Sequence, residues 1–284
     1  MIADRNGNII QRETALKSMR FFYRTFLGRL LLKPLVQPWV SRLMGKYKDS
    51  GRSCRAIPKF IEKNHIDMSI YEDREFTSYN DFFTRKIKPG ARSLCMDADA
   101  LMSPCDCKLS VYTADESGMY EIKNSLYALS DLVGEENAKA FVGGTLLVFR
   151  LTVDDYHRYA FFDDGTAEKP VHIPGVFHTV NPIAMERYKV FSRNTREYTL
   201  LHTKNFGLAA QIEVGALMVG RIVNHDKTDF VRGEEKGYFE FGGSTVILLL
   251  QKGVAKIDED ILRNMQNGLE TRILFGEKIG TKIK

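Results

Sequence analysis

Apolar residues recur at three- and four-residue intervals along residues 14–48, and basic residues occupy the positions between them. The apolar positions are Leu16, Met19, Phe22, Tyr23, Phe26, Leu27, Leu30 and Leu31. This spacing predicts an amphipathic helix. Pro34 and Pro38 interrupt the pattern, and apolar residues from Trp39 to Met44 continue it, so we expect a second helix there.

Two interpretations of this basic helical hairpin remain open. It resembles helices that lie in the plane of a membrane interface, with the apolar face in the lipid and the basic face toward the headgroups. A helix that packs on its own domain and exposes a basic face to water has the same pattern.

Shorter helices are predicted over residues 54–64 and 78–86, the second with Ser78 as its N-cap. Residues 88–94 are rich in turn-forming residues, which predicts turns after the second of these helices. After these residues the sequence consists of short runs that are rich in β-branched residues or that alternate apolar and polar residues. Gly, Asp and Asn bound the runs, which predicts β-strands. The runs are residues 101–112, 145–153, 159–162, 171–178, 198–202, 209–221 and 244–251.

Only residues 126–140 and 183–188 look helical after residue 94. The sequence therefore predicts an α+β fold, in which a mainly antiparallel β domain (residues 91–284) follows a helical, basic segment (residues 1–90) that the first of the two interpretations associates with a membrane.

The net charge of +5 conceals an uneven distribution. Residues 1–60 contain 13 Lys and Arg against Asp4, Glu13 and Asp49, which leaves the rest of the 284-residue chain acidic. A basic segment of this kind predicts an anionic surface as partner. The chain has no P-loop, zinc-finger spacing or RNP-like run, so we expect a phospholipid membrane and no nucleic acid. No apolar run reaches the ~18–20 residues that cross a bilayer, which predicts peripheral binding.

The four cysteines, Cys54, Cys95, Cys105 and Cys107, indicate free thiols in a reducing cytoplasm, since the N-terminus lacks a secretory signal. The Cys105-x-Cys107 pair is too closely spaced for a usual zinc site, so no metal is expected.

The most informative stretch is Gly242-Gly243-Ser244-Thr245, where two strand-like runs meet. One interpretation is a strand that begins after a glycine bulge. Gly-Ser is also the dipeptide used for self-cleavage by an N-to-O acyl shift, because the serine Oγ can attack the preceding carbonyl and glycine tolerates a strained φ. Elimination from the resulting ester leaves a dehydroalanine, which becomes a pyruvoyl ketone.

Several further motifs, in order along the chain, resemble the phosphatidylserine decarboxylase family from about Phe82 to Gly280. They are Phe82–Arg92 (FFTRKIKPGAR), Ser103–Asp106 (SPCD), Asp155–Arg158 (DYHR), Val180–Pro182 (VNP), Glu213–Ala216 (EVGA) with Val219–Gly220, Gly233–Gly237 (GEEKG) and Gly243–Thr245 (GST).

The resemblance implies a zymogen that cuts itself between Gly243 and Ser244, leaving two associated chains. The second chain would begin with a covalent pyruvoyl cofactor made from Ser244. Its ketone would form a Schiff base with phosphatidylserine and act as the electron sink for decarboxylation to phosphatidylethanolamine. His157 matches the family's proton donor in decarboxylation, and Asp106 matches the aspartate that supports self-cleavage.

The chain departs from the family at two positions, one of which is Cys107, where the usual Asp-Gly after Ser-Pro is Asp106-Cys107. The usual motif is His-Arg-x-His, whose second histidine is the cleavage base, whereas this sequence has Ala160 there. Either His157 serves both steps, or His178 or Cys107 reaches Ser244, or the chain matures slowly or not at all.

Two other functions therefore stay open: a pyruvoyl-type decarboxylase of another amino-carboxylate, and an unprocessed relative that binds lipid without activity. For the main interpretation we expect peripheral association with the cytoplasmic face of the cell membrane. The sequence leaves the oligomeric state open, a homodimer included.

Overall fold

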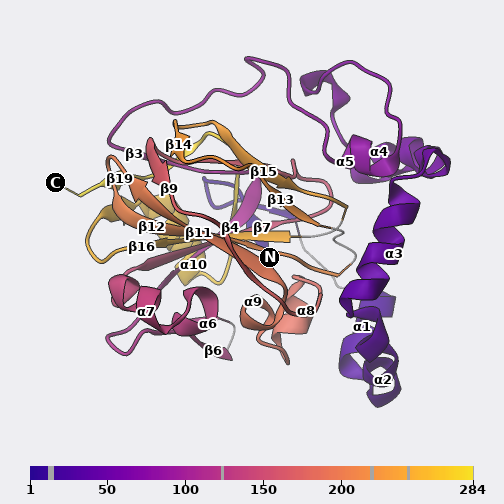
Figure 1. The fold of residues 1–284 in the computed structure, drawn as a ribbon, viewed down its shortest axis with the longest axis horizontal. Helices are drawn as coiled ribbons and strands as arrows, with labels where there is room; N and C mark the ends of the chain where they lie inside the picture. The colour runs from indigo at the N-terminus through magenta and orange to yellow at the C-terminus, as the bar shows by residue number, and fades with distance from the viewer. Residues whose placement is uncertain (12–15, 123–124, 218–220, 242–243, 284) are drawn as a thin grey trace.

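Antiparallel strands form a large sheet at the centre of the molecule, and three N-terminal helices stand beside it (Figure 1). The computed structural model describes residues 1–11, 16–122, 125–217, 221–241 and 244–283. Both helices and strands are present and the main sheet is mostly antiparallel, which confirms the predicted α+β class.

The main sheet has eleven strands among the described residues. In spatial order they are β14 (Asp229–Phe230), β9 (Gly165–Ala167), β11 (Arg196–Thr203), β12 (Gly207–Val214), β16 (Ser244–Leu250), β7 (Thr145–Leu151), β4 (Cys107–Thr113), β18 (Glu270–Ile273), β1 (Ile2–Ala3) and β2 (Ile9–Gln11), with β10 (Val171–Ile173) paired to β11. Among the strand pairs described in this sheet, β1 and β18 alone run parallel. The N-terminal strands thus join the body, while the predicted domain division at residue 90 stays a prediction.

Three smaller sheets accompany it. One contains β13 (Ile222–Asn224), β15 (Glu235–Phe239) and β8 (Arg158–Ala160), another contains β17 (Ala255–Ile257), β19 (Lys278–Lys282) and β3 (Ala100–Met102), and β5 (Met119–Ile122) pairs with β6 (Ser125–Ala128).

The N-terminal helices are α1 (Lys17–Arg24), α2 (Phe26–Leu35) and α3 (Pro38–Lys48), followed by η1 (Gly51–Ala56), α4 (Ile57–Asn64), η2 (Met68–Ile70) and α5 (Tyr79–Phe83). Pro34 was predicted to interrupt the helix, but it lies inside the last turn of α2, where its fixed φ is compatible with helix. Pro38 begins α3, where its missing N–H removes no helical hydrogen bond. The Ser78 hydroxyl accepts from the backbone N–H of Asp81, which confirms the predicted N-cap of α5.

The later helices are α6 (Ser130–Val133), α7 (Glu135–Ala138), η3 (Lys139–Phe141), α8 (Pro182–Met185), α9 (Val190–Arg193) and α10 (Glu259–Gln266). The helix predicted over residues 126–140 was wrong at its start, because Tyr127 pairs across the β5–β6 hairpin with Tyr120. Their rings stack with centroids 5.4 Å apart, a tertiary contact that overrides the local periodicity. The run 171–178 is strand only through Ile173, since Pro174 and Gly175 end it.

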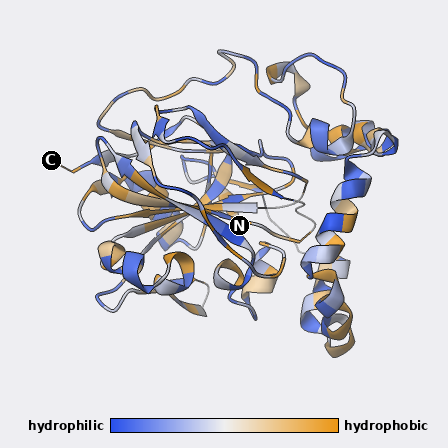
Figure 2. Cartoon of the chain, in the orientation of Figure 1, coloured by the Kyte–Doolittle hydropathy of each residue, from blue (hydrophilic) through white to orange (hydrophobic). Residues whose placement is uncertain are grey.

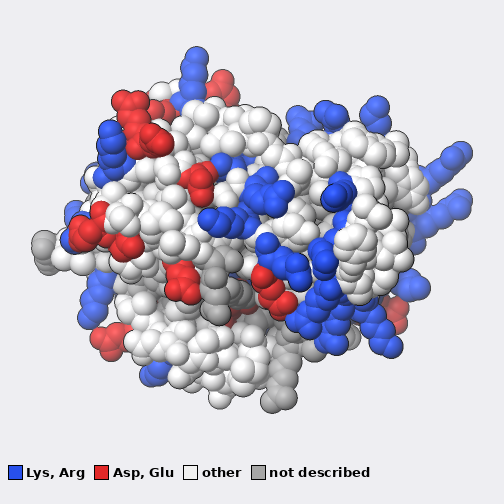
Figure 3. Space-filling view, turned by 90° about the horizontal axis from the view of Figure 1, so that it is seen from below, with Lys and Arg blue, Asp and Glu red and all other residues white. Residues whose placement is uncertain are grey.

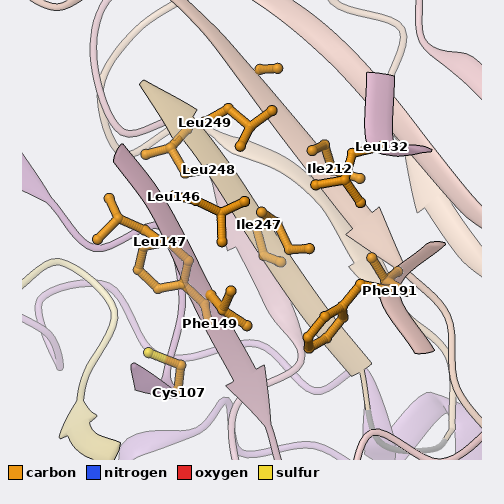
Figure 4. Close-up of a cluster of buried hydrophobic side chains, with 14 of the residues drawn as sticks. Cys107, Leu132, Leu146, Leu147, Phe149, Phe191, Ile212, Ile247, Leu248 and Leu249 are labelled. Atoms are coloured by element: carbon orange, nitrogen blue, oxygen red, sulfur yellow. The ribbon is translucent and has the colours of Figure 1, made fainter. Parts of the chain in front are cut away.

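The main core lies on the central strands, where Leu146, Leu147, Phe149 and residues 247–249 are buried (Figure 4). Every residue of β16 is buried. Because packed apolar side chains surround this strand on both faces, its first residue, Ser244, is held in a fixed position.

A second, smaller core joins α4 and α5. It consists of Ile57, Tyr79, Phe82 and Phe83, with Phe241 packed against it. This core connects the helical N-terminal region to the residue three positions before Ser244.

Candidate active site

Ser244 is the first residue of β16, where this strand lies between β12 and β7. It pairs with Leu151 of β7, and the next residue, Thr245, pairs with Val214 of β12. The Ser244 side chain is fully buried. The strand therefore begins where the sequence predicted, while Gly242 and Gly243, the predicted bulge and cleavage position, lie outside the described residues.

The imidazole of His157 is the side chain that the structure brings to Ser244. The Ser244 Oγ lies 3.4 Å from His157 Nδ1, although 87 positions separate them in the sequence. His157 directly precedes β8, and its carbonyl accepts from the N–H of Phe239 at 2.9 Å. The distance is long for a hydrogen bond, as is common at catalytic pairs before the reacting geometry is reached.

The other nitrogen of this ring fixes the tautomer. His157 Nε2 lies 3.0 Å from the backbone carbonyl oxygen of Thr152, which can only accept a hydrogen bond. Nε2 therefore carries the proton, and Nδ1 presents its lone pair to Ser244. Burial, with the Arg85 guanidinium as the next cause, lowers the pKa of His157 to about 3, so the ring is neutral near pH 7.

A buried ion pair holds the segment that carries the Thr152 carbonyl. Lys108 Nζ donates to both carboxylate oxygens of Asp155 at 2.8 and 2.7 Å. Asp155 Oδ2 also accepts from the backbone N–H of Thr152 at 2.6 Å. Because the Lys108 and Asp155 side chains are only 2% and 9% exposed, this network is shielded from water and fixes the loop that orients His157.

Aromatic residues of α5 also pack against the site. No role was assigned to them from the sequence. The Phe83 ring stacks on His157 with centroids 4.1 Å apart. The backbone N–H of Phe241 donates to Asn80 Oδ1 at 3.1 Å, and the Phe241 ring packs on Tyr79 and Phe83. Helix α5 thus positions both the histidine and the segment that leads to Ser244. The available signal was the pair Phe82-Phe83, which opens the family motif Phe82–Arg92.

Asp106 lies in a separate network. Its carboxylate accepts from Arg92 Nη2 at 3.0 Å and from the backbone N–H of Phe275 at 2.7 Å. Within the described residues, none of its hydrogen bonds goes to His157 or Ser244. Burial raises the pKa of Asp106 to about 6. The role in self-cleavage implied for Asp106 stays a prediction.

Position 160 is the last residue of β8, and its alanine side chain has no group that could accept a proton. The N–H of Ala160 donates to the Pro104 carbonyl at 2.9 Å, and this residue borders a cavity of about 140 Å³ together with Tyr156 and Phe275. The two other candidate bases lie elsewhere. His178 Nδ1 is 3.4 Å from the Tyr23 hydroxyl, and its ring stacks on Tyr188.

Burial lowers the pKa of His178 to about 4. Cys107 is buried at the start of β4, where burial raises the pKa of its thiol and disfavours the thiolate. Among the described residues, only His157 has a side-chain hydrogen bond to Ser244. No group of three or more His, Cys, Asp or Glu side chains in this part of the chain is arranged to hold a metal ion.

The arrangement of a buried serine, a neutral histidine with its lone pair toward the hydroxyl, and a preceding Gly-Gly suits attack of Oγ on a neighbouring carbonyl. Comparison with known proteins agrees with this chemistry. A family model described as phosphatidylserine decarboxylase matches residues 79–281.

Named relatives cover almost the whole chain. Phosphatidylserine decarboxylase proenzyme 2 of Clostridium acetobutylicum is 49% identical over 264 residues, which cover 92% of this chain and 91% of that protein. The phosphatidylserine decarboxylase proenzyme of Clostridium novyi is 40% identical over 93% of this chain and 92% of its own length. The corresponding protein of Desulfitobacterium hafniense is 40% identical over 97% and 95%. The chain belongs to the phosphatidylserine decarboxylase family.

Proposed function

We propose that this chain decarboxylates phosphatidylserine to phosphatidylethanolamine, using a pyruvoyl group that it generates by cutting itself before Ser244. The observation that carries the proposal is the contact of Ser244 Oγ with the unprotonated Nδ1 of His157. The relatives support the substrate, and the word proenzyme in their names supports the self-processing.

His157 takes the role of cleavage base in this proposal, because Ala160 has no proton acceptor. Nδ1 accepts the Ser244 Oγ–H proton as Oγ attacks the preceding carbonyl carbon. The C–N peptide bond breaks, the nitrogen takes up a proton, and an ester joins the two segments. Abstraction of the Cα proton of residue 244 then forms a Cα=Cβ double bond, breaks the Cβ–Oγ bond and releases the carboxylate of the first chain. Water replaces the nitrogen at the resulting dehydroalanine, and ammonia leaves.

The buried end of β16 fits the pyruvoyl group that this sequence produces. Residue 244 is fully buried and bordered by the His157 ring, so bulk water is kept away. The ketone supplies an electron sink for the pair released when carbon dioxide leaves the substrate. Phe83 and Thr152 hold the imidazole in place throughout.

His157 is also placed to deliver a proton to the substrate carbon. Once the Ser244 hydroxyl has been consumed, Nδ1 faces the position where the substrate is bound. The carboxylate of a bound substrate raises the pKa of the imidazole, because a nearby negative charge favours the protonated ring. One histidine then serves both steps.

Electrophoresis with mass spectrometry tests the proposal. Active protein should separate under denaturing conditions into two fragments, the smaller spanning residues 244–284 and lighter by one ammonia than simple hydrolysis would make it. The Ser244→Ala variant should remain a single chain and release no carbon dioxide from phosphatidylserine. An intact chain with ordinary serine in active material would contradict the proposal. Activity on a soluble amino-carboxylate alone would instead favour another substrate.

We further propose that α2 and α3 bind the surface of an anionic membrane. Large apolar side chains are exposed along these helices, which Figure 2 shows as alternating orange and blue bands. The docking face consists of Phe26, Leu27, Leu30, Leu31, Trp39 and Leu43, which are 48–79% exposed. Since a water-exposed apolar surface of this size is costly in a soluble monomer, it favours a lipid interface as the environment.

The charge distribution supports the same partner. Lys and Arg gather at the end of the molecule that carries the N-terminal helices, on the right of Figure 3. Anionic lipid attracts such residues with about 1 kcal/mol for each Lys or Arg near the surface. Among the described residues, no helix is both long and apolar enough to span a bilayer. The proposal is therefore peripheral binding, at the cytoplasmic face of the cell membrane.

A further inference from the structure

A cavity of about 520 Å³ lies where α3 meets the body of the molecule, outside the Ser244–His157 pair. Helix α3 contributes Pro38 and Arg42, and the body contributes residues on and near β10, β11 and β13. The lining residues that matter here are Arg42, Arg221, Phe177, Thr195 and Glu197.

The floor of this cavity is close to Ser244. The backbone N–H of Gly215 donates to the Thr195 carbonyl at 2.9 Å. Gly215 follows Val214, which pairs with Thr245, so the next position along the two strands brings Gly215 beside Ser244. Neighbouring strands are about 4.8 Å apart, which places Thr195 about 10 Å from Ser244 with Gly215 between them.

The Phe177 ring occupies the place where a side chain at position 215 would lie. A Cβ atom at this position would come within 2.7 Å of Cε1 of Phe177, closer than real Cβ contacts allow. The Phe177 ring therefore packs directly over the Gly215 backbone and forms a wall of the cavity. A larger residue at position 215 would displace this ring.

The cavity carries two cations, and the positive charge of Arg221 also acts on the nearby Glu240 carboxylate. Arg42 and Arg221 are exposed, and within the described residues neither guanidinium has a hydrogen bond or an ion pair. By contrast, Glu197 is satisfied, because its carboxylate faces His172 Nδ1 at 3.2 Å and accepts from Asn224 Nδ2 at 2.9 Å. The groups free to bind a ligand are therefore the two arginines.

We propose that this cavity binds the phosphodiester of the glycerophospholipid substrate between Arg42 and Arg221, so that the amino-acid end of the headgroup is directed past the Phe177 ring toward residue 244. Guanidinium groups bind phosphate oxygens through paired, charge-assisted hydrogen bonds. The apolar walls formed by Pro38 and Phe177 suit the glycerol end of the lipid. This assignment rests on the proposed decarboxylase function and gives it a substrate subsite.

The position of Arg42 connects this subsite to the membrane. Arg42 lies on α3 between Trp39 and Leu43, two exposed apolar residues of the docking face. A lipid entering beside α3 would thus meet the arginine pair before it reaches Ser244.

The test compares Arg42→Ala and Arg221→Ala with Arg263→Ala, which removes an exposed arginine from α10, outside the cavity. Phosphatidylserine is supplied in micelles of an uncharged detergent, so that membrane attraction does not contribute. Loss of one charge-assisted contact should raise KM about tenfold or more, leave kcat within about threefold, and leave self-cleavage intact on a denaturing gel. Arg263→Ala should have the wild-type KM.

Two outcomes overturn the subsite. One is a wild-type KM in both cavity variants, and the other is an equal rise in KM in the Arg263 control. If Arg221→Ala fails to mature, Arg42→Ala, on a different element, decides. A wild-type protein that neither cuts itself nor releases carbon dioxide would refute the proposed function, which is a separate result.

Discussion

The backbone carbonyl of Thr152 lies 3.0 Å from Nε2 of His157, and this contact decides which nitrogen of the ring can act as a base. A carbonyl oxygen has no proton to donate, so Nε2 is the protonated nitrogen and Nδ1 the acceptor. In Ser-His-Asp enzymes a carboxylate sets the tautomer. Here a main-chain oxygen does so, and the buried Lys108–Asp155 pair holds that oxygen in place.

Replacing His157 with Ala should slow self-cleavage by about 100- to 10,000-fold, because the Ser244 hydroxyl loses its proton acceptor. A time course of fragment appearance on a denaturing gel measures this rate. His178→Ala is the matched control, since His178 contacts Tyr23 rather than Ser244, and it should cleave at nearly the wild-type rate. If the His178 variant were blocked and the His157 variant were not, the base would be misassigned.

The pH dependence of cleavage should separate Asp106 from His157. Because the pKa of His157 is lowered to about 3, its ring stays unprotonated from pH 5 to 8 and adds no acid limb there. The pKa of Asp106 is raised to about 6. If its carboxylate supports cleavage, the rate should rise with pH through about 6, and Asp106→Asn should remove that rise. A midpoint near 6 that persists in the Asn variant would assign the titration to another group.

The lowered pKa of His157 should make the free energy of unfolding depend on pH in a defined direction. The folded pKa of about 3 lies below the unfolded value of 6.5, so between these values the unfolded state binds more protons. The free energy of unfolding of the uncut Ser244→Ala protein should therefore fall as pH drops from 6.5 toward 3. Adding His157→Gln should make this slope shallower by about one proton, as measured by urea unfolding at a series of pH values. An unchanged slope would contradict the buried, neutral state of the ring.

Asp155→Ala should destabilise the protein by about 3–5 kcal/mol, because it removes the close carboxylate of the buried Lys108 and leaves only the more distant, partly exposed Asp154. It should also slow cleavage, since Asp155 holds the backbone N–H of Thr152. Denaturant unfolding of the uncut form measures the first effect. Asp154→Ala provides the control, because that carboxylate is 38% exposed and 3.9 Å from Lys108, and should cost less than about 1 kcal/mol. Equal losses would mean that the buried pair is not the support we infer.

A triple variant in which Phe26, Leu30 and Leu43 are all replaced by Ser should bind anionic vesicles at least about a hundredfold more weakly in a sedimentation assay. The reason is that each apolar side chain buried in the lipid contributes on the order of 1.5–3 kcal/mol. High salt should weaken the wild type as well. Val231, which is 60% exposed on the body, gives the control Val231→Ser. Vesicle binding that survives the triple substitution, or that falls equally with Val231→Ser, would remove α2 and α3 from the membrane interface.

The sequence by itself determined the α+β class, the helical character of the N-terminal segment without its break at Thr25, the N-cap at Ser78 and the strand that begins at Ser244, since each depends on spacing along a short segment. The motifs also singled out Ser244 and His157. Only the tertiary structure decided that Nδ1 faces the hydroxyl, that Phe83 and Asn80 hold the site, and that Asp106 lies in another network. These contacts join residues up to 169 positions apart, and long-range packing against a shared core, which fixes them, leaves no local periodicity to read.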